Sequence, residues 1–168
     1  MVNILSMVDL TSISALLAAI GVLVGVVFAI LELRNLVKTR QTDLTLRLHS
    51  VWTTEGMLEL WQKIYNLKFK DYADFEKRYG SWLSENPEQT ALTAVINHFE
   101  VVGYLMQRKM IDHGLVDLMP VSMTWTKLKP IVEGIREQYA SPRIYEMIEY
   151  AYNEVQKYRE QRLQQTQS

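Results

Sequence analysis

The positions of polar residues divide the chain into an apolar N-terminal stretch and a mixed remainder. Between Ile13 and Leu31 the only polar residue is Ser14, and none of these residues is charged. At about 1.5 Å of rise per residue, a helix of this length spans nearly the whole hydrocarbon core of a bilayer. Apolar residues lie on every face of it, unlike the one-sided stripe of a surface helix. The pattern predicts a transmembrane helix over residues 13–31.

After Leu31 the apolar positions follow the helical period almost throughout, and no sustained stretch alternates as a strand would. Residues 32–52 contain neither Gly nor Pro, so the membrane span is expected to continue unbroken as a helical stalk. Gly, Pro and candidate capping residues divide the sequence after Trp52 into several shorter helices. Pro130 is expected either to kink one helix or to separate two. The later helices are expected to cover residues 57–67 and 71–80, to begin at Asn86-Pro87, to cover 115–119 and 125–139, and to begin again at Ser141-Pro142.

These elements predict an all-α fold, in which one N-terminal transmembrane helix continues into a cytoplasmic multi-helix bundle. The part after the span is within the usual size of one domain with its own core. The expected parts are a short extracytoplasmic N-terminus (1–12), the transmembrane helix (13–31), a helical stalk (32–52), a cytoplasmic helical domain (53–161) and a polar tail (162–168).

The distribution of charge predicts the orientation in the membrane. The chain has 18 basic and 19 acidic residues, yet every Lys and Arg follows Leu31, and the only charge before it is Asp9. Basic residues resist translocation, so Arg34, Lys38 and Arg40 are expected to hold the C-terminal part in the cytoplasm at the cell (inner) membrane, with the N-terminus outside. These residues are also expected to contact anionic headgroups weakly. The stretch lacks the basic start and small-residue cleavage site of a signal peptide.

Small residues recur within the predicted span. Gly21, Gly25 and Ala29 are spaced by four, which places them on one face of a helix. Such faces let a second membrane helix approach closely, although Gly and Ala are also common in transmembrane helices without this role. We take these residues as the candidate site for packing on a second copy or on another membrane protein.

Two stretches of the chain resemble a known family. Asn97 to Val116 reads NHFEVVGYLMQRKMIDHGLV, and Trp125 to Tyr152 reads WTKLKPIVEGIREQYASPRIYEMIEYAY. Together they resemble the uncharacterised domain-of-unknown-function family 4760, over roughly Leu33 to Tyr158. The resemblance implies one N-terminal membrane helix that carries a cytoplasmic helical domain. It brings no catalytic residue.

No motif for catalysis or cofactor binding stands out. The chain has no cysteine, its three histidines are far apart, and it has no glycine-rich phosphate loop. No metal site and no cofactor are therefore expected. One pair remains as an alternative, because Arg108 and His113 have the R-x-x-x-x-H spacing seen in HEPN ribonucleases. The segment also reads as an ordinary helix end, and we favour that interpretation.

The sequence is thus most typical of a single-pass membrane protein that acts by association, as an assembly, scaffold or regulatory subunit without catalysis. The expected partners are the lipid bilayer and either a second copy or another membrane protein. Near-neutral net charge gives no reason to expect nucleic acid, and no small-molecule substrate is evident. A membrane-tethered ribonuclease that uses Arg108 and His113 is the alternative.

Overall fold

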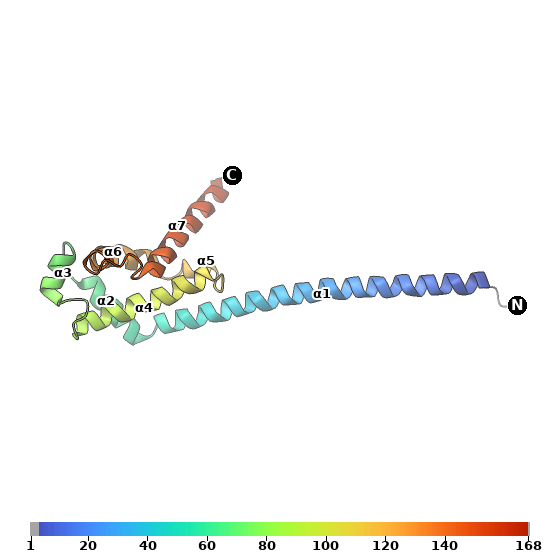
Figure 1. Ribbon diagram of the computed structural model, residues 1–168, viewed down its shortest axis with the longest axis horizontal. Helices are drawn as coiled ribbons and strands as arrows, with labels where there is room; N and C mark the ends of the chain where they lie inside the picture. Colours follow the sequence, from blue (N-terminus) through green and yellow to red (C-terminus); the bar gives the residue numbers. More distant parts are fainter. Residues whose placement is uncertain (1–3, 168) are drawn as a thin grey trace. The chain divides into compact units, whose positions relative to one another are not determined.

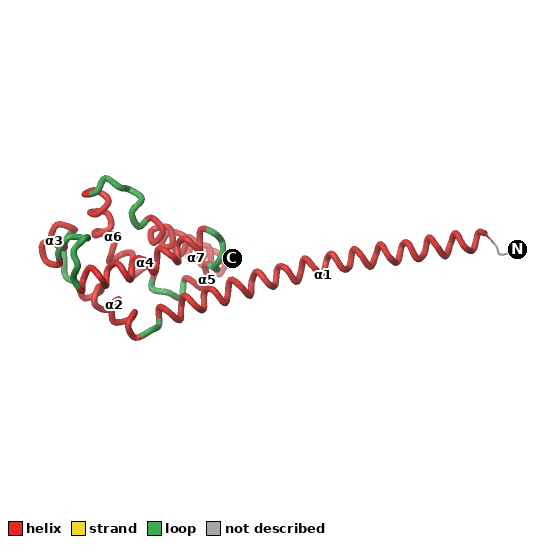
Figure 2. Tube along the Cα trace, turned by 60° about the horizontal axis from the view of Figure 1, so that its bottom comes forward, coloured by secondary structure: helices red, strands yellow, loops and turns green. Residues whose placement is uncertain are grey.

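The computed structural model describes the backbone of residues 4–167 and the side chains of residues 12–166. The described chain is all α-helical and contains no strand, as predicted (Figures 1 and 2). The helices are α1 (Ile4–Trp52), α2 (Glu55–Asn66), α3 (Tyr72–Tyr79), α4 (Pro87–Gln107), α5 (His113–Val116), α6 (Val121–Gln138) and α7 (Glu146–Gln167).

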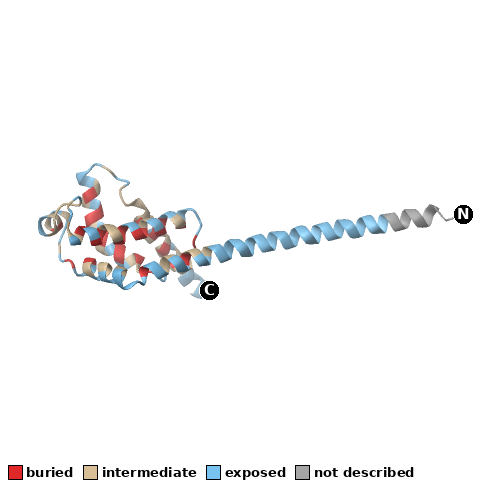
Figure 3. Ribbon diagram, turned by 90° about the horizontal axis from the view of Figure 1, so that it is seen from below, coloured by how far each residue is buried: buried red, intermediate tan, exposed pale blue. Residues whose placement is uncertain are grey.

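The chain forms two compact units, Met1–Arg40 and Gln41–Ser168. Helix α1 runs through the boundary without a break, so the predicted continuation of the apolar helix to Trp52 is confirmed. By length and composition, the described part of the chain contains one helix able to cross a membrane, the segment Ser12–Trp52. Every side chain from Ser12 to Arg40 is exposed (Figure 3). The apolar residues from Ser12 to Arg40 therefore contribute to no core formed by the described part of the chain.

The core of the second unit is built around α4. This helix packs mainly against α7 and α2, and α6 closes the core against α3 and α7. Residues of α4 with no exposed surface include Leu92, Phe99 and Met106. The last turns of α1 also belong here, because Trp52 is only 5% exposed and its ring lies 4.9 Å from that of Phe99. The buried residues shown in Figure 3 are confined to this unit.

The helix starts that the sequence indicated are made by side-chain caps. Each capping oxygen accepts a backbone N–H of the first turn, which satisfies a donor that has no partner within the helix. Gly80 ends α3 at a φ of 83°, where glycine carries no steric penalty. The caps are Thr54 to Met57 (3.4 Å), Asp71 to Asp74 (2.8 Å) and Asn86 to Gln89 (2.9 Å), and Pro87 stands in the first turn of α4.

Helix α6 differs from the prediction in two ways. It begins at Val121 instead of Trp125, and Pro130 lies within one continuous helix instead of between two. The earlier start is stabilised by Thr124, whose N–H and hydroxyl both donate to the carbonyl of Pro120 (2.9 and 2.8 Å). The preceding short helix covers His113–Val116 instead of the predicted residues 115–119.

The last helix begins later than predicted. Residues 142–145 form turns, and α7 starts at Glu146. Tyr145 has a φ of 55°, a conformation that cannot continue a right-handed helix. Arg136 stabilises this turn, because its guanidinium donates to the carbonyls of Ile144 (2.8 Å) and Tyr145 (3.2 Å) and to Glu149 (2.7 Å). Those carbonyls are therefore satisfied by a side chain from α6, which local sequence patterns do not reveal.

Candidate functional site

The small residues predicted to pack in the membrane lie on an open face of α1. A Cβ added at Gly21 or Gly25 would meet nothing within 4 Å. Ala29 is exposed on the same helix, one turn further along. The described residues therefore give these three positions no packing partner, and their role in association stays a prediction.

The basic residues that follow the apolar stretch are exposed. Arg34, Lys38 and Arg40 lie in the last turns of the first unit. Their expected contact with lipid headgroups and their effect on topology stay predictions.

Arg108 and His113 lie on opposite sides of a loop. Arg108 ends α4, and its guanidinium lies 5.3 Å from the centre of the Tyr104 ring. The next residues close a helix end of the left-handed type: Lys109 has a φ of 55°, and the Met110 N–H donates to the Leu105 carbonyl (2.9 Å). His113 is the first residue of α5. Among the described residues, no hydrogen bond joins the two side chains, and nothing in the geometry favours a ribonuclease site.

The structure groups no metal ligands within its described part, since no three His, Cys, Asp or Glu side chains lie together there. His98 is nearly buried on α4, and its ring lies 5.5 Å from that of Trp52. Burial lowers the pKa of His98, and no described residue forms a hydrogen bond with its Nε2 atom. This histidine is therefore a neutral member of an aromatic cluster at pH 7.

Glu100 connects α4 to the beginning of α7. Its Oε1 atom accepts the N–H of Ile148 at 2.7 Å, at a helix start where the first N–H groups lack partners. Burial raises the pKa of this carboxyl, and the backbone N–H groups of Ile148 and Met147 offset part of the effect. A carboxylate at a helix N-terminus is favourable, whereas its burial is unfavourable. The raised pKa indicates that burial is the larger effect.

Replacing Glu100 with glutamine is expected to change how stability depends on pH. A carboxyl whose pKa is raised on folding stabilises the protein below its unfolded pKa of 4.5, and this contribution is lost as pH rises through the folded pKa. Glu100→Gln should therefore match the wild type below pH 4.5 and be the more stable protein at pH values above the raised pKa of the folded carboxyl. Urea unfolding followed by tryptophan fluorescence measures this. Glu160→Gln, on the exposed side of α7, is the control. A variant less stable than wild type at high pH would show that the helix-capping charge outweighs its burial.

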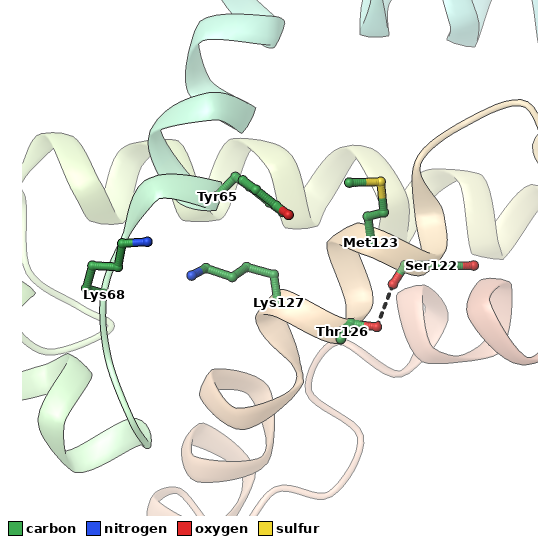
Figure 4. Close-up of a pocket in the computed structure, with 6 residues that line it drawn as sticks. All are labelled: Tyr65, Lys68, Ser122, Met123, Thr126 and Lys127. Carbon is green, nitrogen blue, oxygen red and sulfur yellow. Dashed lines mark hydrogen bonds between the residues drawn. The ribbon is translucent and has the colours of Figure 1, made fainter.

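A site lined by two lysines lies between the segment that follows α2 and the first half of α6 (Figure 4). It is a hollow of about 540 Å³, which we call the lysine hollow. Its lining residues are Tyr65, Lys68, Ser122, Met123, Thr126 and Lys127. In Figure 4 the ammonium groups of the two lysines point toward one another. This site was not predicted from the sequence, because Lys68 and Lys127 belong to separate segments of the chain and no local spacing relates them.

Lys127 is held firmly in the lysine hollow. Its Nζ atom donates to the carbonyl of Leu67 (2.5 Å) and lies 4.7 Å from the centre of the Phe69 ring. Burial lowers the pKa of Lys127, and the charge of Lys68 lowers it further. Among the described residues, neither lysine forms an ion pair with a carboxylate. The two positive charges therefore face one hollow, where no carboxylate from the described part of the chain neutralises them.

A second, more open groove runs beside the first half of α4. It encloses about 930 Å³ and includes the loop before α4. Trp82 in this loop is half-buried, and its indole N–H donates to the Tyr145 hydroxyl (2.9 Å). The neighbouring Leu83 is 70% exposed. Trp82 is thus a packing residue, and Leu83 is the exposed apolar residue of this loop.

Comparison with known proteins identifies one relationship. A family model described as a domain of unknown function, DUF4760, matches residues 19–155. The match includes part of the apolar stretch, all of α2 to α6 and the buried part of α7. No curated protein and no solved structure matches the chain.

Proposed function

The chain belongs to the DUF4760 family of domains of unknown function, and we propose that it is a single-pass membrane protein that acts by association. Residues 13–31 would cross the cell (inner) membrane with the N-terminus outside, and the helical unit would lie on the cytoplasmic side. There it would serve as an assembly, scaffold or regulatory subunit, with no catalysis of its own. Its partners would be a second copy or another membrane protein.

The observation that carries this function is the exposure of the apolar part of α1. Leu16 and Phe28 are 63% and 67% exposed, and no side chain of the most apolar window is buried. Leaving apolar surface in water costs about 25 cal/mol for each Å². A helix that is apolar on all sides therefore requires lipid or another protein around it. The basic residues Arg34, Lys38 and Arg40 support a cytoplasmic location for the helical unit.

Extraction and protection experiments test the placement in the membrane. The full chain should stay with vesicles washed in alkaline carbonate, and protease added outside intact cells should leave the helical unit undigested. Release by carbonate would contradict the anchor, and digestion from outside would contradict the topology. A mature chain that lacks residues 13–31 would identify the stretch as a cleaved leader.

Association through the span makes a separate prediction. The double variant Gly21→Leu, Gly25→Leu should weaken self-association in vesicles about tenfold, a change of about 1.4 kcal/mol, because larger side chains on this face keep the two backbones from packing closely. Energy transfer between two labelled copies measures the effect. The control is Val22→Leu with Val26→Leu, which has the same spacing on a neighbouring face. If both double variants associate equally, the face of Gly21 and Gly25 does not mediate self-association, and another membrane protein would be the partner.

Ribonuclease activity is the outcome that would overturn a purely associative role. Purified full-length chain should leave single-stranded RNA intact. Cleavage that is lost in His113→Ala would instead assign catalysis to the loop between α4 and α5.

A further inference from the structure

We propose that the lysine hollow binds a phosphate-bearing organic anion between Lys68 and Lys127. This inference does not depend on the associative role proposed above. It rests on the arrangement of two ammonium groups, a phenol and an apolar side chain around one hollow of the second unit (Figure 4).

The charge of the hollow favours a phosphate. Two like charges that face one another repel, and Lys127 is partly withdrawn from water, which strengthens the repulsion. A phosphomonoester carries a charge of about −1.5 to −2 at pH 7, so one such group neutralises both lysines. A single carboxylate would leave one of them unpaired. The full chain has a net charge of −1, and two lysines do not form the extended basic surface that nucleic acids require.

Hydrogen-bond donors remain available for such a group. The ammonium of Lys127 has three N–H groups, and the carbonyl of Leu67 accepts one of them. This bond fixes the side chain, so a ligand does not have to order it. Lys68 is exposed and brings three further donors. The hydroxyl of Thr126 already donates to the carbonyl of Ser122 (2.8 Å), which leaves its oxygen to accept.

The size and remaining lining of the hollow favour an organic phosphate over the free ion. A volume of about 540 Å³ is in the range of small-molecule sites and much larger than a phosphate ion needs. Met123 is 50% exposed at this position, and the Tyr65 ring stacks on Trp61 with 5.2 Å between centres. These side chains offer a flat aromatic edge and a polarisable apolar surface to the organic part of a ligand.

Titration of the full chain in nanodiscs of phosphatidylcholine tests the site. The probes are phenyl phosphate and inorganic phosphate, and calorimetry measures the dissociation constants. Phenyl phosphate should bind saturably, and inorganic phosphate about tenfold more weakly, because it lacks the apolar contacts. Absence of saturable phenyl phosphate binding would overturn the site, and equal binding of both probes would overturn the organic part of the ligand.

Charge variants locate the binding. Lys68→Gln and Lys127→Gln should each weaken phenyl phosphate binding by about tenfold or more, because a hydrogen bond to a charged group contributes about 1.5–3 kcal/mol. Lys129→Gln is the matched control, since Lys129 is exposed on the same helix and pairs with Glu133 (3.7 Å). Tryptophan fluorescence and thermal unfolding confirm that each variant is folded. A loss of affinity in Lys129→Gln equal to that in Lys127→Gln would show general charge attraction and contradict a defined site.

The source of the phosphate is distinguished by lipid composition. In nanodiscs that contain phosphatidic acid, a lipid headgroup that enters the hollow competes with phenyl phosphate and raises its apparent dissociation constant. A constant that does not change assigns the hollow to a soluble organic phosphate. In either case Lys127→Gln must bind phenyl phosphate more weakly than the control variant, and its failure to do so would contradict the site.

Discussion

Replacing Trp52 with alanine is expected to destabilise the second unit by about 3–5 kcal/mol, the usual cost of removing a buried tryptophan. Trp52 is the last residue of α1 and is 5% exposed. Its ring contacts Phe99 (4.9 Å), His98 (5.5 Å) and Trp61 (6.2 Å, edge-on), so it joins α1, α2 and α4 at one point. A small domain has about 5–15 kcal/mol of stability in all, so this single change removes a large part of it.

Urea unfolding of the full chain in a non-ionic detergent measures the loss. The other three tryptophans (Trp61, Trp82 and Trp125) lie in the second unit, so their fluorescence follows this unit and not the apolar stretch. Val51→Ala is the matched control, because Val51 precedes Trp52 on the same helix and is 49% exposed. It should change stability by less than about 0.5 kcal/mol. A comparable loss in both variants would mean that the end of α1 is not docked on α4.

Much of the fold could be predicted because its signals are local. Apolar residues at helical spacing predicted α2, α4 and the core face of α7, and Asn86-Pro87 marked the start of α4 correctly. The sequence failed where a distant group decides a boundary. Arg136 satisfies the carbonyls of Ile144 and Tyr145 and so delays α7 to Glu146, and no pattern near Ser141 records that contact.

The candidate sites, like the helix boundaries, could be predicted only where one local segment carries all the residues. The face of Gly21 and Gly25 is visible in the sequence because one helix carries all its residues. The lysine hollow is not visible, since one of its ammonium groups comes from the loop after α2 and the other from the first half of α6. The Arg108 and His113 spacing shows the opposite case, in which a short sequence pattern coincides with the end of one helix and the start of the next.

Replacing Gly103 with alanine is expected to destabilise the second unit by about 3 kcal/mol, the upper part of the range for overpacked cores. Gly103 lies on α4 with no room for a side chain, because an added Cβ would overlap the backbone carbonyl of Met147. A backbone atom cannot rotate away as a side chain can, so α7 would have to move from α4. Gly56→Ala is the control, since nothing lies within 4 Å of its added Cβ and alanine favours helix. It should keep or slightly raise stability in the same urea titration.

The position of Gly103 also explains how Glu100 reaches α7. The two residues are three apart on α4 and therefore face the same neighbour, where Glu100 accepts the Ile148 N–H and Gly103 meets Met147. Close approach at Gly103 brings the start of α7 within reach of the Glu100 carboxylate. In the Gly103→Ala background, Glu100→Gln should therefore no longer alter the pH dependence of stability. Additive effects of the two substitutions would show that Glu100 caps α7 independently of that close approach.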